Sequence, residues 1–378
     1  MLQNVTVTPS RRSLEFGIYR DGDNNLDAIQ KSTLSQALRT SGRDAAIEFT
    51  VEDTTSLRHG VDGGELHTYD YTIADGEIAG ARSSKAHDMS DEANLARFVA
   101  RTLDNAETAS AKQTWIDLVD HGGGDGGGLE TGDGSVMSMP DIAKAISDGV
   151  ALHAAAHPED SARSIDGVIA NQCLMDTMGF ADALSNAGVR YLAASPETML
   201  APGVPSDVAH VIANNENDSS AMASGIVNDV MRTKYDAGDY GGFGPAAAFD
   251  VLDLDSAKIR LAEAAIKRLN DDVAAAASDP AIRGAVRQDA RSIAGMVRFP
   301  DATKDMPWRA DRPAIAFYGA LASDGRLDQR LRTDASAAAV AVGGLVLAHS
   351  ESARFKPFGG ADYSDAVGPT VHLPTSRK

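Results

Sequence analysis

Short apolar runs alternate with segments of helical spacing along roughly the first half of the chain. The runs are rich in β-branched and aromatic residues, which is typical of strands, and the segments between them repeat apolar residues every three or four positions. The predicted strands cover residues 14–19, 47–51, 66–73, 115–119, 166–173 and 191–194. The predicted helices cover residues 26–38, 91–104, 139–156 and 175–186. Strand–helix–strand repeats of this kind predict a largely parallel sheet with helices on both faces.

Beyond about residue 206 the pattern becomes mainly helical and rich in alanine. We expect a long helix over residues 258–275, with Asp253 or Asp255 as its N-cap because both precede the apolar repeat. A late apolar segment, residues 370–373, is a candidate strand for the edge of the sheet.

No internal repeat and no clear linker divides the chain, so we expect a single domain over residues 1–378. Its sheet core, with the candidate catalytic residues, is expected at 1–205 and its helical part at 206–378. The fold class is therefore expected to be α/β, with a mostly parallel central sheet sandwiched by helices and a helix-rich C-terminal half.

Composition narrows the classes of partner. The formal charge of −19 disfavours nucleic acid and anionic membranes, and it suits a cationic substrate. A single cysteine excludes an internal disulfide. No apolar run is long enough to span a bilayer, and the first residues have no apolar core before Arg11 and Arg12. We therefore expect a cytoplasmic protein as the chain is written, or a secreted one if a leader was removed.

Two predicted strands end in residues that carry chemistry. The single cysteine, Cys173, closes the run 166–173, and His121 follows the run 115–119 and precedes a glycine-rich segment. The carboxyl ends of strands in open α/β sheets are where ligands bind. A cysteine and a histidine brought together there are the minimum set for thiolate catalysis. The two residues are 52 positions apart, close to the spacing of about 50 in caspases.

Several segments together point to a known family. They are Phe16-Gly17-Ile18-Tyr19, Asp23-Asn24-Asn25-Leu26, Asp120-His121-Gly122-Gly123-Gly124 and Cys173-Leu174-Met175, followed by residues 191–195, 202–203, 247–250, 254–256 and 371–374. With these segments the chain resembles the clostripain-like cysteine peptidases of the caspase–hemoglobinase group. The resemblance spans nearly the whole length of the chain.

The resemblance implies a caspase-like fold and cleavage of a protein or peptide substrate after a basic residue. Cys173 would be the nucleophile and His121 the general acid and base. The backbone N–H of Gly122 would bind the oxyanion, together with that of Cys173, since glycine permits the close approach that such a donor needs. The chemistry requires no cofactor, although some members of the family respond to Ca²⁺.

The chain departs from the family pattern around the cysteine. Asn171 stands where relatives often have an acidic residue, and Asp176 follows the Cys173-Leu174-Met175 segment where they usually have glycine. We take five residues as candidates for substrate binding: Asn171, Asp176, Ser195, Glu197 and Asp207. The carboxylate that would select a basic side chain is left open among Glu197, Asp176 and Asp207.

Relatives can be activated by cutting themselves between the histidine and cysteine segments. Lys144 and Arg163 are the basic residues in that interval. Lys144 falls in a predicted helix, whereas Arg163 falls in a polar stretch expected to be an exposed loop. Self-cleavage, if it occurs, is therefore expected after Arg163.

Two further motifs are interpreted without a metal. The segment that starts at Asp21 begins like a calcium loop, but it lacks the required glycine and ends in Ser32 instead of glutamate, so capping of the next helix is the preferred interpretation. His153 and His157 have ligand-like spacing without a matching third ligand, so surface histidines are expected. We predict no metal site.

Three functions agree with the sequence. The first is an active cysteine endopeptidase. The second is a catalytically silent, peptidase-like interaction module, suggested by the altered positions near Cys173. The third is a peptide ligase with the same dyad, because an amine can capture the acyl group in place of water.

Overall fold

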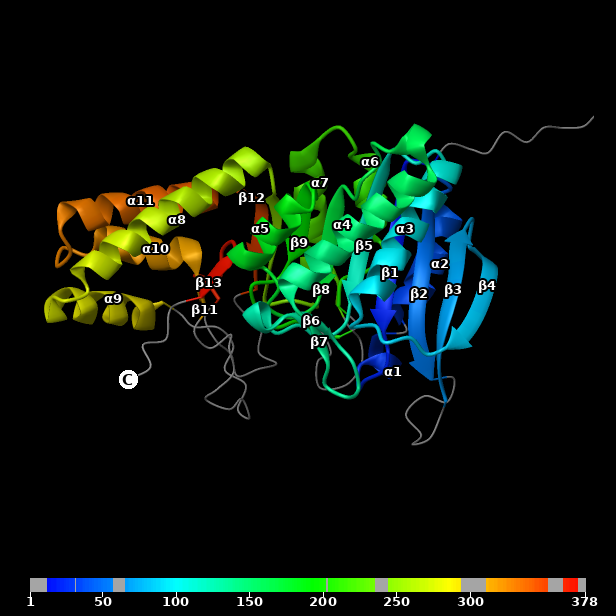
Figure 1. Cartoon of the computed structure of the whole chain (residues 1–378), viewed down its shortest axis with the longest axis horizontal. Helices are drawn as coiled ribbons and strands as arrows, with labels where there is room; N and C mark the ends of the chain where they lie inside the picture. The colour runs from blue at the N-terminus through cyan, green and yellow to red at the C-terminus, as the bar shows by residue number, and fades with distance from the viewer. Residues whose placement is uncertain are drawn as a thin grey trace, which may run out of the picture.

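The computed structural model describes residues 12–30, 32–56, 65–201, 203–234, 244–293, 311–352 and 363–372. Within these ranges the centre is a nine-stranded sheet in the order β12-β10-β9-β8-β5-β1-β2-β3-β4 (Figure 1). Its strands are β1 (Leu14–Asp21), β2 (Ile47–Ser56), β3 (Leu66–Ala74), β4 (Glu77–Lys85), β5 (Gln113–Val119), β8 (Gly167–Asn171), β9 (Tyr191–Ala194), β10 (Ala248–Asp253) and β12 (Val346–Glu351).

The five central strands, β9, β8, β5, β1 and β2, are parallel, and antiparallel pairs extend the sheet at both edges. Side chains along a strand alternate between the two faces. In β5, Ile116 and Leu118 enter one buried apolar cluster, whereas Trp115 and Val119 enter the other. The prediction of a mostly parallel α/β sheet between helices is confirmed.

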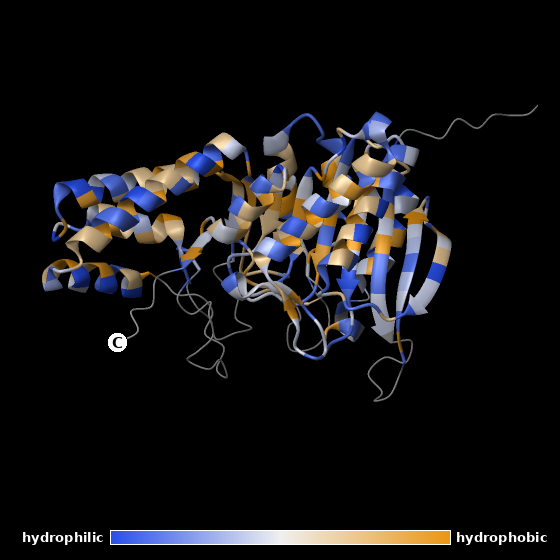
Figure 2. Cartoon of the chain, viewed as in Figure 1, coloured by the Kyte–Doolittle hydropathy of each residue, from blue (hydrophilic) through white to orange (hydrophobic). Residues whose placement is uncertain are grey.

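Helices cover both faces of the sheet, and Figure 2 shows hydrophobic residues along the central strands and on the helices that pack against them. One face carries α3 (Glu92–Thr108), α4 (Met139–Ala156) and α5 (Met178–Asn186). The other carries α2 (Ser32–Arg43), α6 (Val208–Asn214) and α7 (Ser219–Arg232). A short helix, α1 (Asp27–Gln30), precedes α2. Among the described helices, none is long and apolar enough to cross a membrane.

The C-terminal part packs beside β12 as four helices (Figure 1). They are α8 (Ser256–Ala276), α9 (Pro280–Ser292), α10 (Ala314–Ser323) and α11 (Gln329–Gly343). Asp255 caps α8, accepting hydrogen bonds from the backbone N–H groups of Ala257 and Lys258, so the second of the two predicted N-caps is the one used. This part also supplies β10 and β12 to the central sheet, which the alanine-rich pattern did not indicate.

The predicted late strand forms, but its predicted position is wrong. β13 (Thr370–His372) pairs with β11 (Asp311–Pro313) in a separate two-stranded sheet. The backbone N–H of Thr370 donates to the carbonyl of Asp176, which lies just before α5. The edges of the central sheet are occupied by β12 and β4 instead.

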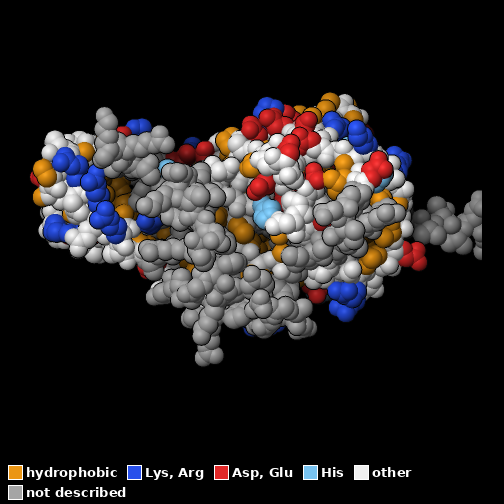
Figure 3. Space-filling view, turned by 90° about the horizontal axis from the view of Figure 1, so that it is seen from below, with side chains coloured by type: hydrophobic (Ala, Val, Ile, Leu, Met, Phe, Trp, Pro, Cys, Tyr) orange, Lys and Arg blue, Asp and Glu red, His pale blue; other side chains and the backbone are white. Residues whose placement is uncertain are grey.

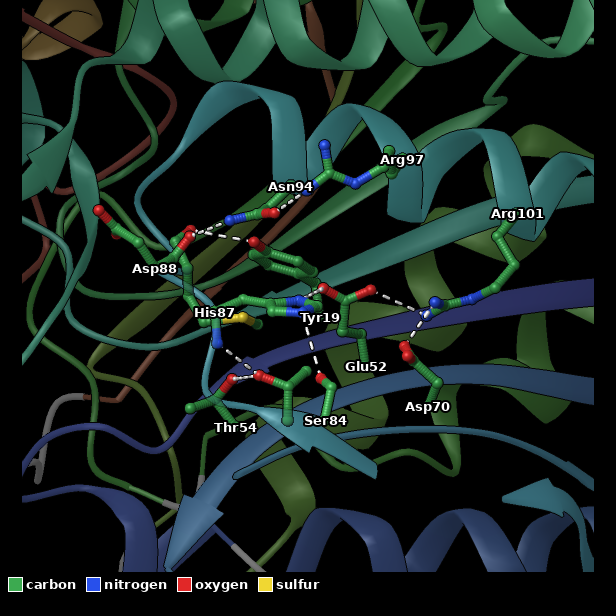
Figure 4. A network of polar contacts seen from close by, with 12 residues as sticks. Tyr19, Glu52, Thr54, Asp70, Ser84, His87, Asp88, Asn94, Arg97 and Arg101 are labelled. Atoms are coloured by element: carbon green, nitrogen blue, oxygen red, sulfur yellow. Dashed lines mark hydrogen bonds and ion pairs between the residues drawn. The ribbon is translucent and has the colours of Figure 1, made fainter. Parts of the chain in front are cut away.

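Polar contacts tie the β1–β4 side of the sheet to α3 (Figure 4). The buried hydroxyl of Tyr19 donates to the carbonyl of Met89 at 3.1 Å. Arg101 on α3 donates to the carboxylate of Glu52 on β2 at 3.0 Å and also pairs with Asp70 on β3. These contacts hold β1, whose carboxyl end leads into the site, against the segment before α3, and they hold β2 and β3 against α3 itself.

Candidate active site

The parallel register places His121 and Cys173 at neighbouring positions. Val119 at the end of β5 pairs with Asn171 at the end of β8. His121 and Cys173 each follow their paired residue by two positions, and neighbouring strands lie about 4.8 Å apart. Both residues therefore leave adjacent strands on the same side of the sheet, at its lower edge in Figure 1.

Gly122 shows how closely the two strand ends approach. A Cβ atom added to Gly122 would lie 2.3 Å from the backbone oxygen of Cys173 and 3.0 Å from its nitrogen. Only glycine fits at this distance. Among the described residues, the backbone N–H of Gly122 has no hydrogen-bond acceptor, so this donor is available beside Cys173.

The thiol of Cys173 is partly buried against the segment after β9. Its Sγ accepts a hydrogen bond from the backbone N–H of Met199 at 3.3 Å and lies 3.7 Å from the carbonyl of Met199. Burial raises the pKa of the thiol, and the nearby carboxylate of Asp120 raises it further. The next residue, Leu174, has φ of +65°, a left-handed conformation that is strained for leucine and turns the chain sharply after the cysteine.

His121 has a partner from the loop after β1. Its Nε2 lies 2.7 Å from Oδ1 of Asn25. A proton donated from Nε2 to this oxygen leaves the lone pair on Nδ1. Burial lowers the pKa of His121, against an opposing effect of Glu130. The neighbouring Asn24 donates to Asp120 Oδ1 at 2.6 Å, which anchors this loop to the end of β5.

Asn25 was not among the candidate residues from the sequence. The available signal was the segment Asp23-Asn24-Asn25-Leu26, which directly follows a predicted strand. Parallel strands bring such a segment to the same edge as His121. The pairing itself joins residues 96 positions apart, which no local pattern reveals.

The candidate substrate residues Asn171 and Ser195 are buried and hydrogen-bonded within the protein. Asn171 Oδ1 accepts from the backbone N–H of Val204 at 2.8 Å, and its Nδ2 lies 3.4 Å from Asp117 Oδ2. Ser195 donates to the carbonyl of Ala248 at 2.7 Å. These side chains hold the segments around Cys173 in place.

The three candidate carboxylates lie in different environments. Glu197 is buried beside Cys173, and its backbone oxygen accepts from the N–H of Leu174. Asp176 is fully buried, and burial raises its pKa, with a further contribution from Asp250. Asp207 is exposed and accepts a hydrogen bond from Thr40 on α2. The structure brings Glu197, but not Asp207, to the turn that follows the cysteine.

Arg163 lies at the opposite end of β8 from Cys173. The five-residue strand between them spans about 16 Å. Arg163 is partly buried, forms an ion pair with Asp160 and donates to the carbonyl of Ala111 at 3.0 Å. In this fold the bond after Arg163 is therefore out of reach of Cys173 in the same molecule, and a cut there requires a second molecule.

Acidic side chains gather around His121. The carboxylates of Asp21, Asp23 and Asp88 influence one another, and those of Asp120 and Glu130 are also close enough to interact. Burial raises the pKa of Asp21 to about 7. Figure 3 looks onto this edge of the sheet and shows red acidic side chains beside a histidine and orange hydrophobic ones. Because burial raises the pKa of Asp21 and of Asp120, the exposed Asp88 and Glu130 contribute most to the negative charge that favours a cationic ligand here.

The expectation that His153 is a surface residue is wrong. The residue is 1% exposed, and its Nδ1 lies 2.7 Å from the carboxylate of Asp104. His157 is partly exposed and stacks on it, with ring centroids 4.9 Å apart. Helices α3 and α4 pack side by side, which brings in carboxylates that the local spacing of the two histidines did not reveal.

No protein-family model matches the chain, and no curated protein sequence matches it. Solved structures do match in fold. A secreted C11 cysteine protease from Bacteroides thetaiotaomicron, in complex with an irreversible peptide inhibitor, superposes with a TM-score of 0.63 at 13% identity, covering 97% of this chain and 94% of that chain. An inactive zymogen C11 protease from Parabacteroides distasonis matches with a TM-score of 0.57 at 13% identity, covering 98% and 93%.

These matches establish the architecture of the chain along nearly its whole length. The chain has the caspase-like fold of the C11, or clostripain-like, cysteine proteases. The fold implied by the sequence resemblance is thereby confirmed.

Proposed function

We propose that the protein is a cysteine endopeptidase with Cys173 as nucleophile and His121 as general base and acid. The observation that carries the proposal is the β5–β8 register, which delivers both side chains from adjacent strand ends. The fold, which is that of C11 cysteine proteases, supports the same assignment. Asn25 would act as a positioning residue, giving a Cys–His–Asn arrangement of the kind that papain-like proteases use on an unrelated fold.

The reaction follows from these positions. His121 accepts the thiol proton, and Cys173 Sγ attacks the scissile carbonyl carbon to form a tetrahedral intermediate. The backbone N–H of Gly122 donates to the developing oxyanion. Collapse breaks the C–N bond as His121 protonates the leaving amine. Water, deprotonated by His121, then hydrolyses the thioester and releases the carboxylic acid and the thiol.

We propose a basic residue before the cut. The support is the group of acidic side chains near His121, in which Asp23, Asp88 and Glu130 are the more exposed members. A Lys or Arg side chain would gain from this field, which weakens with rising salt. The B. thetaiotaomicron protease with the same fold was solved with a peptide inhibitor, which supports a peptide as the substrate class.

The full-length protein incubated with fluorogenic peptides that differ before the cut tests the proposal. We expect cleavage of Lys and Arg peptides that iodoacetamide abolishes. Cleavage of neutral peptides alone would reject the basic preference but keep the peptidase. Transfer of the acyl group to an added amine would identify a ligase. No cleavage, with Cys173 unreactive to the reagent, would favour the interaction module.

Asn25→Ala is expected to lower kcat/KM by about 10- to 100-fold, because the imidazole of His121 loses the partner that sets its orientation. The pH dependence of kcat/KM should shift as well, since the tautomer of His121 is no longer fixed. Steady-state assays from pH 6 to pH 10 measure both effects.

Asn186→Ala is the matched control, because Asn186 is exposed and its side chain donates to the neighbouring Asp182 on α5. It should leave kcat/KM and its pH dependence unchanged. Equal activity of Asn25→Ala and the parent protein would remove Asn25 from the mechanism.

A further inference from the structure

A second cluster of chemically active side chains lies at the amino ends of the central strands, away from Cys173. The last turns of α3 contribute Asp104 and Glu107, and the end of α4 contributes His153 and its C-cap His157. Asp160 follows in a short 3₁₀ turn that leads into β8. Three helical segments thus meet at one group of two imidazoles and three carboxylates.

Three atoms of this cluster converge. Asp104 Oδ1 lies 2.7 Å from His153 Nδ1 and 3.3 Å from His157 Nε2. The ligand atoms of the three residues all lie within 4.8 Å of one another. Tetrahedral zinc with ligands at about 2.0–2.1 Å separates its ligand atoms by about 3.3–3.4 Å. Asp104 is partly exposed, so its carboxylate has room for the small opening that an ion requires.

The opposite edge of each imidazole faces another carboxylate. His157 Nδ1 lies 2.8 Å from Glu107 Oε2, and His153 Nε2 lies 3.7 Å from Asp160 Oδ2. Histidines that bind metals almost always donate their other N–H to a carboxylate, carbonyl or water. His157 therefore already has the outer carboxylate that a metal ligand needs, and His153 has one 3.7 Å away.

His153 provides an independent sign of a missing ligand. Its ring is buried, and within the described chain its Nε2 has no hydrogen-bond partner. With a proton on Nδ1, donated to Asp104, the Nε2 lone pair faces the oxygen of Asp160 unfavourably. An ion bound at Nδ1 moves the proton to Nε2, which then points toward Asp160 as a donor. Nδ1 is then bound to the ion, and a shift of a few tenths of an ångström in Asp160 brings its carboxylate within hydrogen-bond distance of Nε2.

We propose that Asp104, His153 and His157 bind one divalent transition-metal ion, with Zn²⁺ as the best match to two imidazoles and a carboxylate. Water completes the coordination on the exposed side. Glu107 and Asp160 orient the two imidazoles. The ion joins the C-terminal ends of α3 and α4, and it holds the turn before β8 in place.

The alternative without an ion is a hydrogen-bonded cluster in which Asp104 accepts from His153 Nδ1 and the outer carboxylates face the two rings. That state leaves the buried Nε2 of His153 without a hydrogen-bond partner among the described residues. Metal binding to the purified protein distinguishes the two states.

Zn²⁺ titration against a chromophoric chelator, on the full-length Cys173→Ala protein, tests the proposal. Alanine at position 173 removes the thiol, which would otherwise bind Zn²⁺, so the result is independent of the proposed peptidase activity. We expect one ion per chain and visible d–d bands of four-coordinate Co²⁺ after substitution. Absence of tight binding and of these bands would overturn the proposal.

Three variants in the same background locate the ion. His157→Asn should weaken Zn²⁺ binding by at least about 100-fold, and Glu107→Gln by roughly 10- to 100-fold because it removes an outer carboxylate. His210→Asn is the matched control, since His210 is exposed and forms an ion pair with Asp44. It should bind like the parent. His372→Asn tests another possible metal site, formed by Asp125, Asp311 and His372. If this variant lost Zn²⁺ binding and His157→Asn kept it, the proposal would also be overturned.

Discussion

Cys173→Ala is expected to abolish peptide hydrolysis, lowering kcat/KM by about 10⁵- to 10⁶-fold. Removal of the nucleophile eliminates the acyl-enzyme pathway, and losses of this size follow removal of one member of a catalytic unit. In the described residues the polar contacts of the thiol are weak ones with the backbone of Met199, and alanine keeps the apolar packing of Cβ, so the fold should be retained. Steady-state assays on the preferred fluorogenic peptide, with circular dichroism and thermal melting of both proteins, measure the effect.

His121→Asn should reduce kcat/KM by a comparable factor, and the double variant should be no worse than either single one, because the two residues act as a unit. His210→Asn, an exposed histidine on α6, serves as control. More than about 1% residual activity in Cys173→Ala would show that Cys173 is not the nucleophile. The hypothesis of an interaction module would then be preferred.

The pH dependence of the parent enzyme tests the same chemistry. The raised pKa of the Cys173 thiol and the lowered pKa of His121 keep both groups neutral at neutral pH. The thiolate fraction therefore grows about tenfold per pH unit up to a pKa above the usual value of about 8.5. We expect kcat/KM and the rate of alkylation to rise together across this range. A plateau already at about pH 6 would indicate a preformed thiolate–imidazolium pair.

Between pH 5 and pH 8 the ionisation of Asp117 is expected to lower the free energy of unfolding of the parent protein by about 3 kcal/mol. Asp117→Asn is expected to remove this fall. Asp117 lies in β5 and is fully buried, and among the described residues its carboxyl accepts one long hydrogen bond, from Asn171. Burial raises its pKa to about 8. Urea unfolding at both pH values, on the parent and on Asp117→Asn, measures the difference.

The sign follows from proton binding in the two states. The folded protein keeps the proton on Asp117 up to about pH 8, whereas the unfolded chain releases it above about pH 3.9. The stabilisation from this group is therefore complete at low pH and is lost as the pH rises through 8. The amide in the variant does not ionise, so that loss disappears.

Asp271→Asn is the control, because Asp271 is exposed and pairs with the exposed Lys267 on α8. It should leave the pH dependence unchanged. Burial raises the pKa values of Asp21 and Glu52 to about 7. These two groups therefore still make the free energy of unfolding depend on pH in both proteins. An identical slope in Asp117→Asn and the parent protein would show that Asp117 stays ionised in the folded state.

The strand ends that carry His121 and Cys173 could be located from the sequence because each follows a local apolar run. β10 could not. It lies between other strands of the sheet and is buried along its whole length, so Ala248 and Phe249 show no alternation and merge with the alanine-rich helical pattern around them. A fully buried strand and a buried helix segment share the same apolar composition.

The partners of the site residues were also beyond local reasoning. Asn171 looked like a pocket residue because of its position near Cys173, yet its amide holds the backbone of Val204, 33 positions away. The contacts of Asn25 with His121 and of Asp104 with His153 also join distant segments. Tertiary packing determines which distant residues contact each other, and these contacts cannot be predicted from the local pattern of a single sequence.

The β5–β8 register has a consequence for how this protein can diverge. Main-chain hydrogen bonds set the spacing of the two strand ends, and these bonds are indifferent to most side-chain changes along β5 and β8. Loops around the strand ends can therefore exchange their polar residues, and with them the choice of peptide, while the separation between His121 and Cys173 is conserved by geometry. Only a slip of one residue in the ladder would turn one of the two side chains to the opposite face.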